Sequence, residues 1–451
     1  MSLATVPRYD SSQITTRGDH AVVVGASMAG LITARVLKDA FETVTVIDRD
    51  SLTDEPVARR GVPQARHPHV LWEAGRATLE DLFPGYSEDL LAAGAVTIDG
   101  KTDLFNYTRG DFLASGREEF KLYSATRPLY EHVVRHHVSE LERVTIQSGC
   151  QFIDYLVDDA ATVVDGVVLR NRDGEQEDLH ADLVVDATGR TSRTPTWLKS
   201  HGVRPPIAEE VHVNVTYSSI FIERPADDHR TFVVMAEAPR TRGGMAAPVE
   251  GDRWLVNLHG VHGDHPPKDD KNLLDFAASL PTPELKQLLN DHSHVGNEVF
   301  HYPFPANRWY HYEDLDRFPD GLVVIGDAVA SFNPIYGQGM SVAALEALVL
   351  HQALATGHED LAVRFFDRAA PVIDNAWKMA IGADFGFPQT EGSKPRGLSV
   401  FNWYMSRLFR RAHTDGALTD AFVRVLTLQK PSSTLLRPTI MWRVFKPTSS
   451  T

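Results

Sequence analysis

A glycine-marked turn near the start of the chain has the residue types of a phosphate-binding site. The segment Gly25-Ala26-Ser27-Met28-Ala29-Gly30 follows the apolar run 21–24 and precedes a helix predicted over 31–39. The first N–H groups of a helix have no partner inside it and lie at the positive end of the helix dipole, where a pyrophosphate is stabilised. Asp48 ends the next strand-like run, where its carboxylate can accept hydrogen bonds from both hydroxyls of a ribose. Because the middle glycine of the usual fingerprint is Ser27 here, an ordinary strand–turn–helix unit is the alternative interpretation.

A second glycine-marked helix start lies far along the chain. Asp327 follows the apolar run 321–325, and the segment Pro334-Ile335-Tyr336-Gly337-Gln338-Gly339-Met340 leads into a helix predicted from Val342. The N–H groups of such a helix start can stabilise negative charge on a ligand, such as a reduced flavin ring. Two helix starts of this kind fit a long ligand with anionic character at both ends. FAD has this shape, whereas NAD would need only the first turn; in the alternative interpretation, Asp327 caps a helix.

The elements that must position these turns indicate an α/β fold. Continuous apolar runs over 182–186 and 321–325, like the run before the first turn, are typical of parallel strands buried on both faces. Residues 205–300 instead show the pattern of half-exposed antiparallel strands, for example over 211–217 and 254–258. After about residue 340 the pattern is helical. We therefore expect a Rossmann-like domain with a parallel sheet, an inserted antiparallel-sheet domain and a helical C-terminal segment.

Composition narrows the classes of partner. The chain has 451 residues and a formal net charge of -15, which argues against nucleic acid or an anionic membrane as the main partner. Its one cysteine, Cys150, excludes an internal disulfide, and together with the lack of a secretory signal it predicts a cytoplasmic protein. No apolar run reaches the ~18 residues of a transmembrane segment. The aromatic and basic segment 401–411 could touch a membrane surface, but we favour a helix packed on the main domain.

From residue 20 to about 380, the chain resembles the flavoprotein monooxygenases of the para-hydroxybenzoate hydroxylase fold. The residues that carry the resemblance fall in the family's order, namely the two glycine turns, Asp48, Arg49, Arg59, Arg127 and Asp327. The segments 60–69 and 332–337 are similar, more closely, to the polyene epoxidases of polyether-antibiotic pathways.

The resemblance implies three regions. A Rossmann-like FAD-binding domain of the glutathione-reductase type would comprise 1–100, 121–204 and 301–365; a substrate-binding domain would comprise 101–120 and 205–300; and a C-terminal helical region would span 366–451. It implies FAD as cofactor and NAD(P)H as reductant, used directly or through a separate flavin reductase. Hydroxylases of this family often carry Asp-Gly, a motif tied to FAD and reduced nicotinamide, where this chain has Thr188-Gly189. That departure weakens the case for direct use of a bound nicotinamide.

The same resemblance assigns roles to the cofactor-binding residues. Ser27 and its neighbours hold the pyrophosphate, which Arg59 also reaches, and Asp48 holds the adenosine ribose. Arg127 contacts the cofactor near its ribityl or phosphate region, Asp327 binds a ribityl hydroxyl, and Pro334 to Gly339 border the isoalloxazine. The full set is Gly25, Ser27, Met28, Ala29, Gly30, Asp48, Arg49, Arg59, Arg127, Asp327, Pro334, Gly337, Gly339 and Met340. Solvated surface positions are the alternative for Arg59 and Arg127. No catalytic side chain is assigned, and no spacing of His and Cys predicts a metal.

The implied reaction is the insertion of one oxygen atom from O2 into a sizeable apolar biosynthetic intermediate, through a flavin C4a-hydroperoxide. It would be an alkene epoxidation or a hydroxylation. An apolar pocket is expected if one face of the sheet covers the flavin, and in the alternative interpretation the same residues form the domain core: Val213, Val215, Tyr217, Phe232, Val234, Met235 and Met245. His67 and His69 are expected in a surface loop, with a role in the active site as the alternative. The alternatives are a flavin-dependent halogenase, although the Trp-x-Trp-x-Ile-Pro segment is absent, a geranylgeranyl-type alkene reductase, and an FAD-binding redox sensor.

Overall fold

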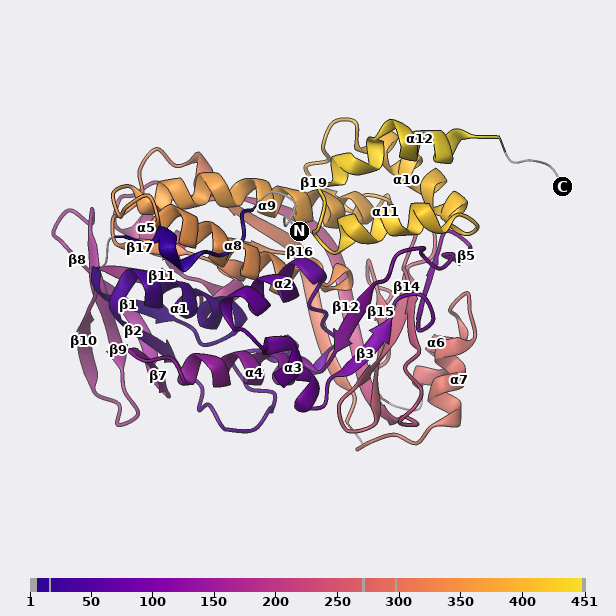
Figure 1. Ribbon diagram of the computed structural model, residues 1–451, viewed down its shortest axis with the longest axis horizontal. Helices are drawn as coiled ribbons and strands as arrows, with labels where there is room; N and C mark the ends of the chain where they lie inside the picture. Colours follow the sequence, from indigo (N-terminus) through magenta and orange to yellow (C-terminus); the bar gives the residue numbers. More distant parts are fainter. Residues whose placement is uncertain (1–5, 16–17, 270–271, 297, 448–451) are drawn as a thin grey trace.

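The computed structural model describes residues 6–15, 18–269, 272–296 and 298–447, and it places a parallel sheet at one end of the molecule (Figure 1). The strand order is β17-β11-β1-β2-β7, and every neighbouring pair is parallel. The strands are β1 (Gly18–Val24), β2 (Phe41–Asp48), β7 (Val144–Ser148), β11 (Leu183–Asp186) and β17 (Leu322–Val324). The three apolar runs recognised in the sequence are thus adjacent strands. The predicted α/β fold class is confirmed.

Among the described residues, seven helices belong to this half of the molecule. They are α1 (Met28–Ala40), α2 (Glu73–Leu82), α3 (Tyr86–Ala92), α4 (Arg127–Ser139), α5 (Thr194–Ser200), α8 (Gly339–Leu354) and α9 (Leu361–Asp384). Of these, α1, α4 and α9 contact strands of the sheet. α1 begins at Met28 rather than residue 31, and α8 begins at Gly339 rather than Val342. The glycine-rich residues therefore form first helical turns instead of preceding loops. α8 contacts α1, α2 and α9, which explains why it is apolar on all sides.

A nine-stranded sheet occupies the other half of the molecule. Along its path the order is β18-β16-β12-β15-β14-β13-β4-β5, and β19 pairs with β12. The strands are β4 (Leu104–Thr108), β5 (Asp111–Phe112), β12 (Ile207–Glu223), β13 (Thr231–Val234), β14 (Arg242–Val249), β15 (Arg253–Gly260), β16 (Phe300–His311), β18 (Ala330–Ser331) and β19 (Glu391–Gly392). All pairs are antiparallel except β4 with β13. The expected domain limit at residue 300 runs through this sheet because β16 pairs with β12, and the domain limits stay a proposal.

Both faces of the nine-stranded sheet are covered in its centre. α6 (Leu273–Ala278) and α7 (Glu284–Asp291) pack on one face, where Phe232, Val234 and Trp254 form a hydrophobic core with them. The residues over 254–258 are all buried. The expectation of a half-exposed strand there is therefore wrong, because protein covers the second face as well.

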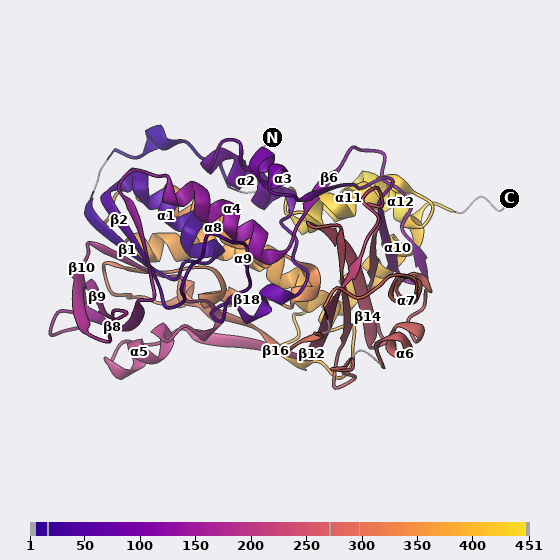
Figure 2. The same cartoon turned by 90° about the horizontal axis from the view of Figure 1, so that it is seen from below.

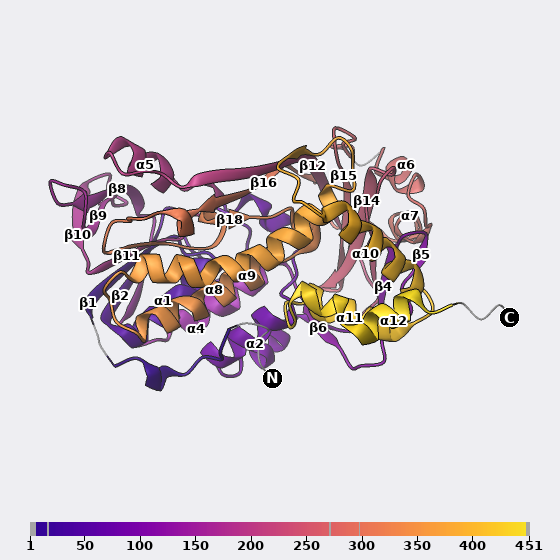
Figure 3. The same ribbon diagram turned by 90° about the horizontal axis from the view of Figure 1, so that it is seen from above.

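The C-terminal region contains α10 (Leu398–Ala412), α11 (Gly416–Leu426) and α12 (Pro438–Phe445). Two small sheets complete the fold, one with β8 (Gln151–Val157), β9 (Val164–Arg170) and β10 (Gln176–His180), the other with β3 (Val96–Asp99) and β6 (Lys121–Ser124). Figures 2 and 3 show the C-terminal helices at the end of the molecule opposite to β8, β9 and β10. α10 packs on α9, as favoured for the segment 401–411. Within the described ranges, no helix combines the length and the apolar character needed to cross a membrane.

Candidate cofactor-binding and active site

The turn between β1 and α1 is compact because glycine occupies both ends. Gly25 has a φ of +112°, and its N–H donates to the carbonyl of Ile47 at 2.8 Å. A Cβ on Gly30 would lie only 1.8 Å from the carbonyl oxygen of Gly25. The side chain of Ser27, the residue before α1, does not cap the helix. The N–H groups at the start of α1 are therefore left for a ligand.

Two arginines from distant parts of the chain lie close to this turn. Arg127, at the start of α4, donates from Nη2 to Ser27 Oγ at 2.7 Å, and Arg59 donates from Nε to Glu131 at 2.8 Å. Glu131 also accepts from Ser27 Oγ at 2.9 Å. Burial would raise the pKa of Glu131, but Arg127 and Arg59 outweigh it and lower that pKa. The surface alternative for both arginines is wrong, since Arg127 is buried and the Arg59 side chain is 10% exposed.

Asp48 lies in the same cluster, at the end of β2. Its carboxylate accepts from the N–H of Ala26 at 2.8 Å and from Nη1 of Arg59 at 3.1 Å. Arg49, the next residue, is exposed. Glu131 was not singled out from the sequence; its position four residues after Arg127 on a predicted helix is the one signal that could have found it.

The second glycine turn touches the first. A Cβ on Gly326 would lie 2.7 Å from Cβ of Ala29, and one on Gly339 would lie 3.7 Å from Oδ1 of Asp327. Burial raises the pKa of Asp327, although Arg190 and Arg127 oppose the shift. The two separate pieces of sequence thus converge on one groove.

The groove presents charged groups of the kind that a nucleotide would contact. Nη1 of Arg127 is buried and lies 3.1 Å from Oε2 of Glu131, so an ion pair holds the guanidinium at the start of α1. Asp327 is half-buried, and the charges of Arg190 and Arg127 act on its carboxylate. A guanidinium beside a helix start fits a phosphate, and a carboxylate fits a hydroxyl. The residues present therefore fit FAD.

A buried polar network holds the loop before α8. The Asn333 side chain accepts from Tyr217 Oη at 2.9 Å and donates to Asp384 at 3.0 Å, and its backbone N–H donates to Asn307 Oδ1 at 2.6 Å. Burial raises the pKa of Asp384 to about 6 against the hydrogen bonds from Asn307 and Asn333. Sequence reasoning missed Asn307 and Asp384, because neither belongs to a motif and both act through residues distant in the chain.

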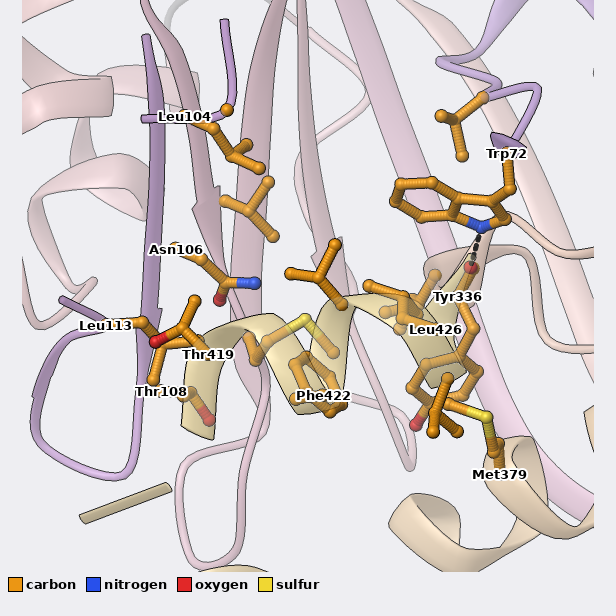
Figure 4. A pocket seen from close by; sticks show the side chains of 18 of the residues that line it. Trp72, Leu104, Asn106, Thr108, Leu113, Tyr336, Met379, Thr419, Phe422 and Leu426 are labelled. Atoms are coloured by element: carbon orange, nitrogen blue, oxygen red, sulfur yellow. Dashed lines mark hydrogen bonds between the residues drawn. The ribbon is translucent and has the colours of Figure 1, made fainter. Parts of the chain in front are cut away.

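The loop 334–339 packs against residues 67–72. Gly337 has a φ of +63°, and a Cβ there would lie 2.2 Å from Cγ1 of Val70. Nε1 of Trp72 donates to the carbonyl of Tyr336 at 3.1 Å (Figure 4). Residues of the two segments that resemble polyene epoxidases, for example His67 and Pro334, also line one small cavity together.

Glu346 of α8 contacts the backbone of the turn that contains Asp327. Its Oε2 accepts from the N–H of Gly326 at 2.6 Å, and the side chain is fully buried. Burial raises the pKa of Glu346 to about 8, although the bond from Gly326 opposes this. Nothing in the sequence distinguishes this glutamate from a surface residue.

A cavity of about 280 Å³ lies between the nine-stranded sheet and the C-terminal helices. Figure 4 shows Phe422 and Leu426 of α11 on one side and Trp72 and Tyr336 at one end. A smaller cavity of about 40 Å³ adjoins it through shared residues such as Pro334. The large cavity therefore ends at the loop before α8.

The predicted lining is partly right. Met235 and Met245 line both cavities, and Tyr217 lines the smaller one. Side chains alternate along a strand, so Val233 lines the cavities while its neighbours Phe232 and Val234 face the core under α6 and α7. Val213 and Val215 likewise belong to a hydrophobic core. The sequence could not show that Phe401, Met405 and Phe409 of α10 complete the wall.

The expectation that His67 and His69 lie in a surface loop is wrong. His67 is buried and its Nδ1 lies 2.7 Å from Ser219 Oγ, and both histidines line the smaller cavity. Burial lowers the pKa of His67 to about 4 and that of His69 to about 3. His259, across the same cavity, has its pKa lowered to about 4 by burial. All three are therefore neutral near pH 7.

Comparison with known proteins places this fold and groove in a family. Residues 19–363 match the family described as FAD binding domain. The chain belongs to this family. The groove between α1 and the Asp327 turn lies within the matched residues, and the para-hydroxybenzoate hydroxylase-type architecture is confirmed.

Several relatives are similar over most of the chain. Protein Rv3254 of Mycobacterium tuberculosis is 35% identical over 91% of this chain and 90% of its own length. Kynurenine 3-monooxygenase of Salinispora tropica is 27% identical over 77% and 74%, and squalene monooxygenase 1,1 of Brassica napus is 23% identical over 76% and 64%. These relatives indicate a flavoprotein of the monooxygenase type.

Solved structures share the fold. The flavin-dependent brominase Bmp2 superposes with a TM-score of 0.67 at 17% identity, covering 94% of this chain and 97% of that one. The 2-methyl-3-hydroxypyridine-5-carboxylic acid oxygenase gives 0.60 at 18%, covering 89% and 96%. At these identities the likeness concerns the fold alone.

Proposed function

We propose that this protein is an FAD-dependent monooxygenase that inserts one oxygen atom from O2 into a sizeable apolar molecule, by epoxidation of an alkene or by hydroxylation. The observation that carries the proposal is the cavity of about 280 Å³, lined by apolar side chains such as Met245 and Phe422, whose end is the loop before α8. The resemblance to polyene epoxidases and the similarity to a squalene monooxygenase favour an alkene.

In this proposal different residues of the groove contact different parts of FAD. Arg127 and the start of α1 would hold the pyrophosphate, with Arg59 held nearby by Glu131, and Asp48 would hold the ribose. Asp327 would accept a hydrogen bond from a ribityl hydroxyl. The start of α8 would stabilise negative charge on the isoalloxazine, beside the loop 334–339.

The protein would position the substrate and exclude water from the site of reaction. Bound and reduced FAD provides the electrons that activate dioxygen, one oxygen atom of which leaves as water. The apolar cavity holds the substrate beside the loop 334–339 and excludes water from it. The neutral His67 and His259 at the smaller cavity offer hydrogen bonds without a buried charge. NAD(P)H would supply the electrons, directly or through a separate flavin reductase.

The proposal is tested with isotopically labelled dioxygen. Holoprotein is reduced anaerobically with light and then mixed with ¹⁸O₂ and, in separate reactions, squalene, farnesol and 1-naphthol. We expect at least one product that carries a single ¹⁸O atom and no oxygen from water. If hydrogen peroxide accounts for all electrons with every probe, the proposal fails; bromide-dependent bromination instead would indicate a halogenase, and alkene reduction without oxygen would indicate a reductase.

Filling the cavity should reduce turnover without removing the cofactor. Val233 lines both cavities, so Val233→Phe is expected to lower kcat/KM at least about tenfold while FAD absorbance stays at the wild-type level. The matched control is Val163→Phe, because Val163 is exposed and is not among the residues that line either cavity. Wild-type turnover by Val233→Phe would show that the substrate binds elsewhere.

A further inference from the structure

Exposed apolar side chains concentrate in the C-terminal region. Among the described residues, ten large apolar side chains are exposed, and six of them lie within 400–445. Val400 is 71% exposed, Trp403 55% and Trp442 65%. Soluble proteins rarely leave such side chains together in water, so the surface they form calls for a partner.

Five of these six side chains lie on α10 and α12, and the two helices contact each other. The rings of Trp403 and Phe445 lie 6.0 Å apart between centroids. The guanidinium carbon of Arg407 lies 5.2 Å from the Phe445 ring centre, and Nζ of Lys446 lies 5.6 Å from that of Trp442. Figure 1 shows α10 and α12 at the upper edge of the molecule. We refer to the surface made by Val400, Trp403, Met441, Trp442 and Phe445 as the aromatic face.

The C-terminal region that carries the aromatic face is basic although the chain as a whole is acidic. Residues 394–447 contain ten Lys and Arg and two Asp, whereas the whole chain has a net charge of -15. One of the two, Asp415, is paired with Arg443 at 2.9 Å and with Lys446 at 3.7 Å. From the net charge of the whole chain we expected that an anionic membrane is not a main partner. That net charge does not show that basic residues are concentrated in the C-terminal region.

Helix geometry places both kinds of residue on the same side of α10. Val400, Trp403, Arg407 and Arg410 follow one another at intervals of three or four residues, so they share one face. Phe401, Met405 and Phe409 line the large cavity. Because their positions fall on the other side of the helix, α10 separates the cavity from the aromatic face.

We propose that the aromatic face docks this protein onto an anionic membrane surface. Tryptophan and phenylalanine beside arginine and lysine match the interface of a bilayer, where rings enter the headgroup region and basic side chains meet anionic lipids. A second copy is a poorer occupant, because two such faces would bring like charges together. Docking places the wall of the large cavity next to the bilayer, and it does not depend on the proposed oxidation.

The test measures binding of the full-length holoprotein to vesicles by co-sedimentation. We expect binding to phosphatidylcholine vesicles that contain about one quarter phosphatidylglycerol, weak binding to phosphatidylcholine alone, and loss of binding at high salt. Replacing both Trp403→Ser and Trp442→Ser should weaken binding at least about tenfold. The matched control changes Ile207→Ser and Val57→Ser, which are 58% and 51% exposed and lie outside the aromatic face.

Two results of the vesicle experiment would contradict the proposal. Failure of the wild-type protein to sediment with anionic vesicles would refute it, as would equal binding by the two double variants. Gel filtration of the same samples addresses the second copy. A wild-type dimer that the tryptophan variant converts to a monomer would assign the aromatic face to self-association instead.

Discussion

Gly30→Ala is expected to yield a protein that no longer retains FAD. The added Cβ would lie 1.8 Å from the carbonyl oxygen of Gly25, a contact that no side-chain rotation relieves. Either α1 moves away from β1 or the turn opens, and in both cases the N–H groups at the start of α1 lose their common direction. We expect FAD affinity to fall at least about a hundredfold. Visible absorbance of the purified protein and a fluorescence titration with FAD measure it.

The matched control is Gly382→Ala in α9. It makes the same change inside a helix, but the nearest atom would lie 3.6 Å away, an ordinary van der Waals contact. Gly382→Ala should therefore retain FAD and the wild-type melting temperature. Retention of FAD by Gly30→Ala at wild-type affinity would show that the cofactor does not lie on this turn.

Glu346→Gln is expected to prevent a large part of the loss of stability that the wild-type protein shows as pH rises from about 4.5 to 8. The folded pKa of Glu346 is raised to about 8, whereas its ordinary value is 4.5. Between these values the unfolded chain releases a proton that the folded protein keeps, so stability falls as pH rises from about 4.5 to 8. Glutamine can accept the same bond from Gly326 and does not titrate in this range. The variant should gain on the order of 3–5 kcal/mol relative to wild type between pH 5 and 9.

Thermal or urea unfolding of the holoprotein across this pH range gives the comparison. All other groups titrate in both proteins, so the difference between the two curves belongs to Glu346. Glu346→Leu serves as the control, because it also abolishes the titration but leaves the Gly326 N–H without its acceptor; it should be less stable than Glu346→Gln at every pH. Parallel curves for wild type and Glu346→Gln would contradict the raised pKa.

The elements of the cofactor groove could be predicted because their signals are local. Continuous apolar runs mark strands buried on both faces, and glycine marks the turns where a side chain would collide with the backbone. Asp48 ends β2 and Asp327 lies just after β17, so the parallel arrangement of the strands brings both to the same edge of the sheet. For this reason the fold class and both glycine turns were readable from the amino-acid sequence.

The hydrogen-bond partners of the groove residues come from distant parts of the chain, so the sequence did not predict them. Asn333 and Asp384 are 51 residues apart, and Ser27 and Glu131 are 104 apart. Whether such a polar group is buried depends on what packs over it, and a single sequence carries no local trace of that packing. The burial of His67 has the same origin, since β12 supplies the Ser219 it contacts.

The shape of the substrate cavity also arose only in three dimensions. Alternation along β13 predicts that Val233 and Phe232 face opposite sides, but not which side is the cavity. That choice depends on which helices cover each face of the sheet. α6 and α7 fill one face with their own leucines, while α10 and α11 stand off the other and enclose a space. A helix can be predicted because its apolar residues repeat every three to four positions. How that helix docks on a sheet depends on contacts between residues far apart in the chain, so it is seen only in the tertiary structure.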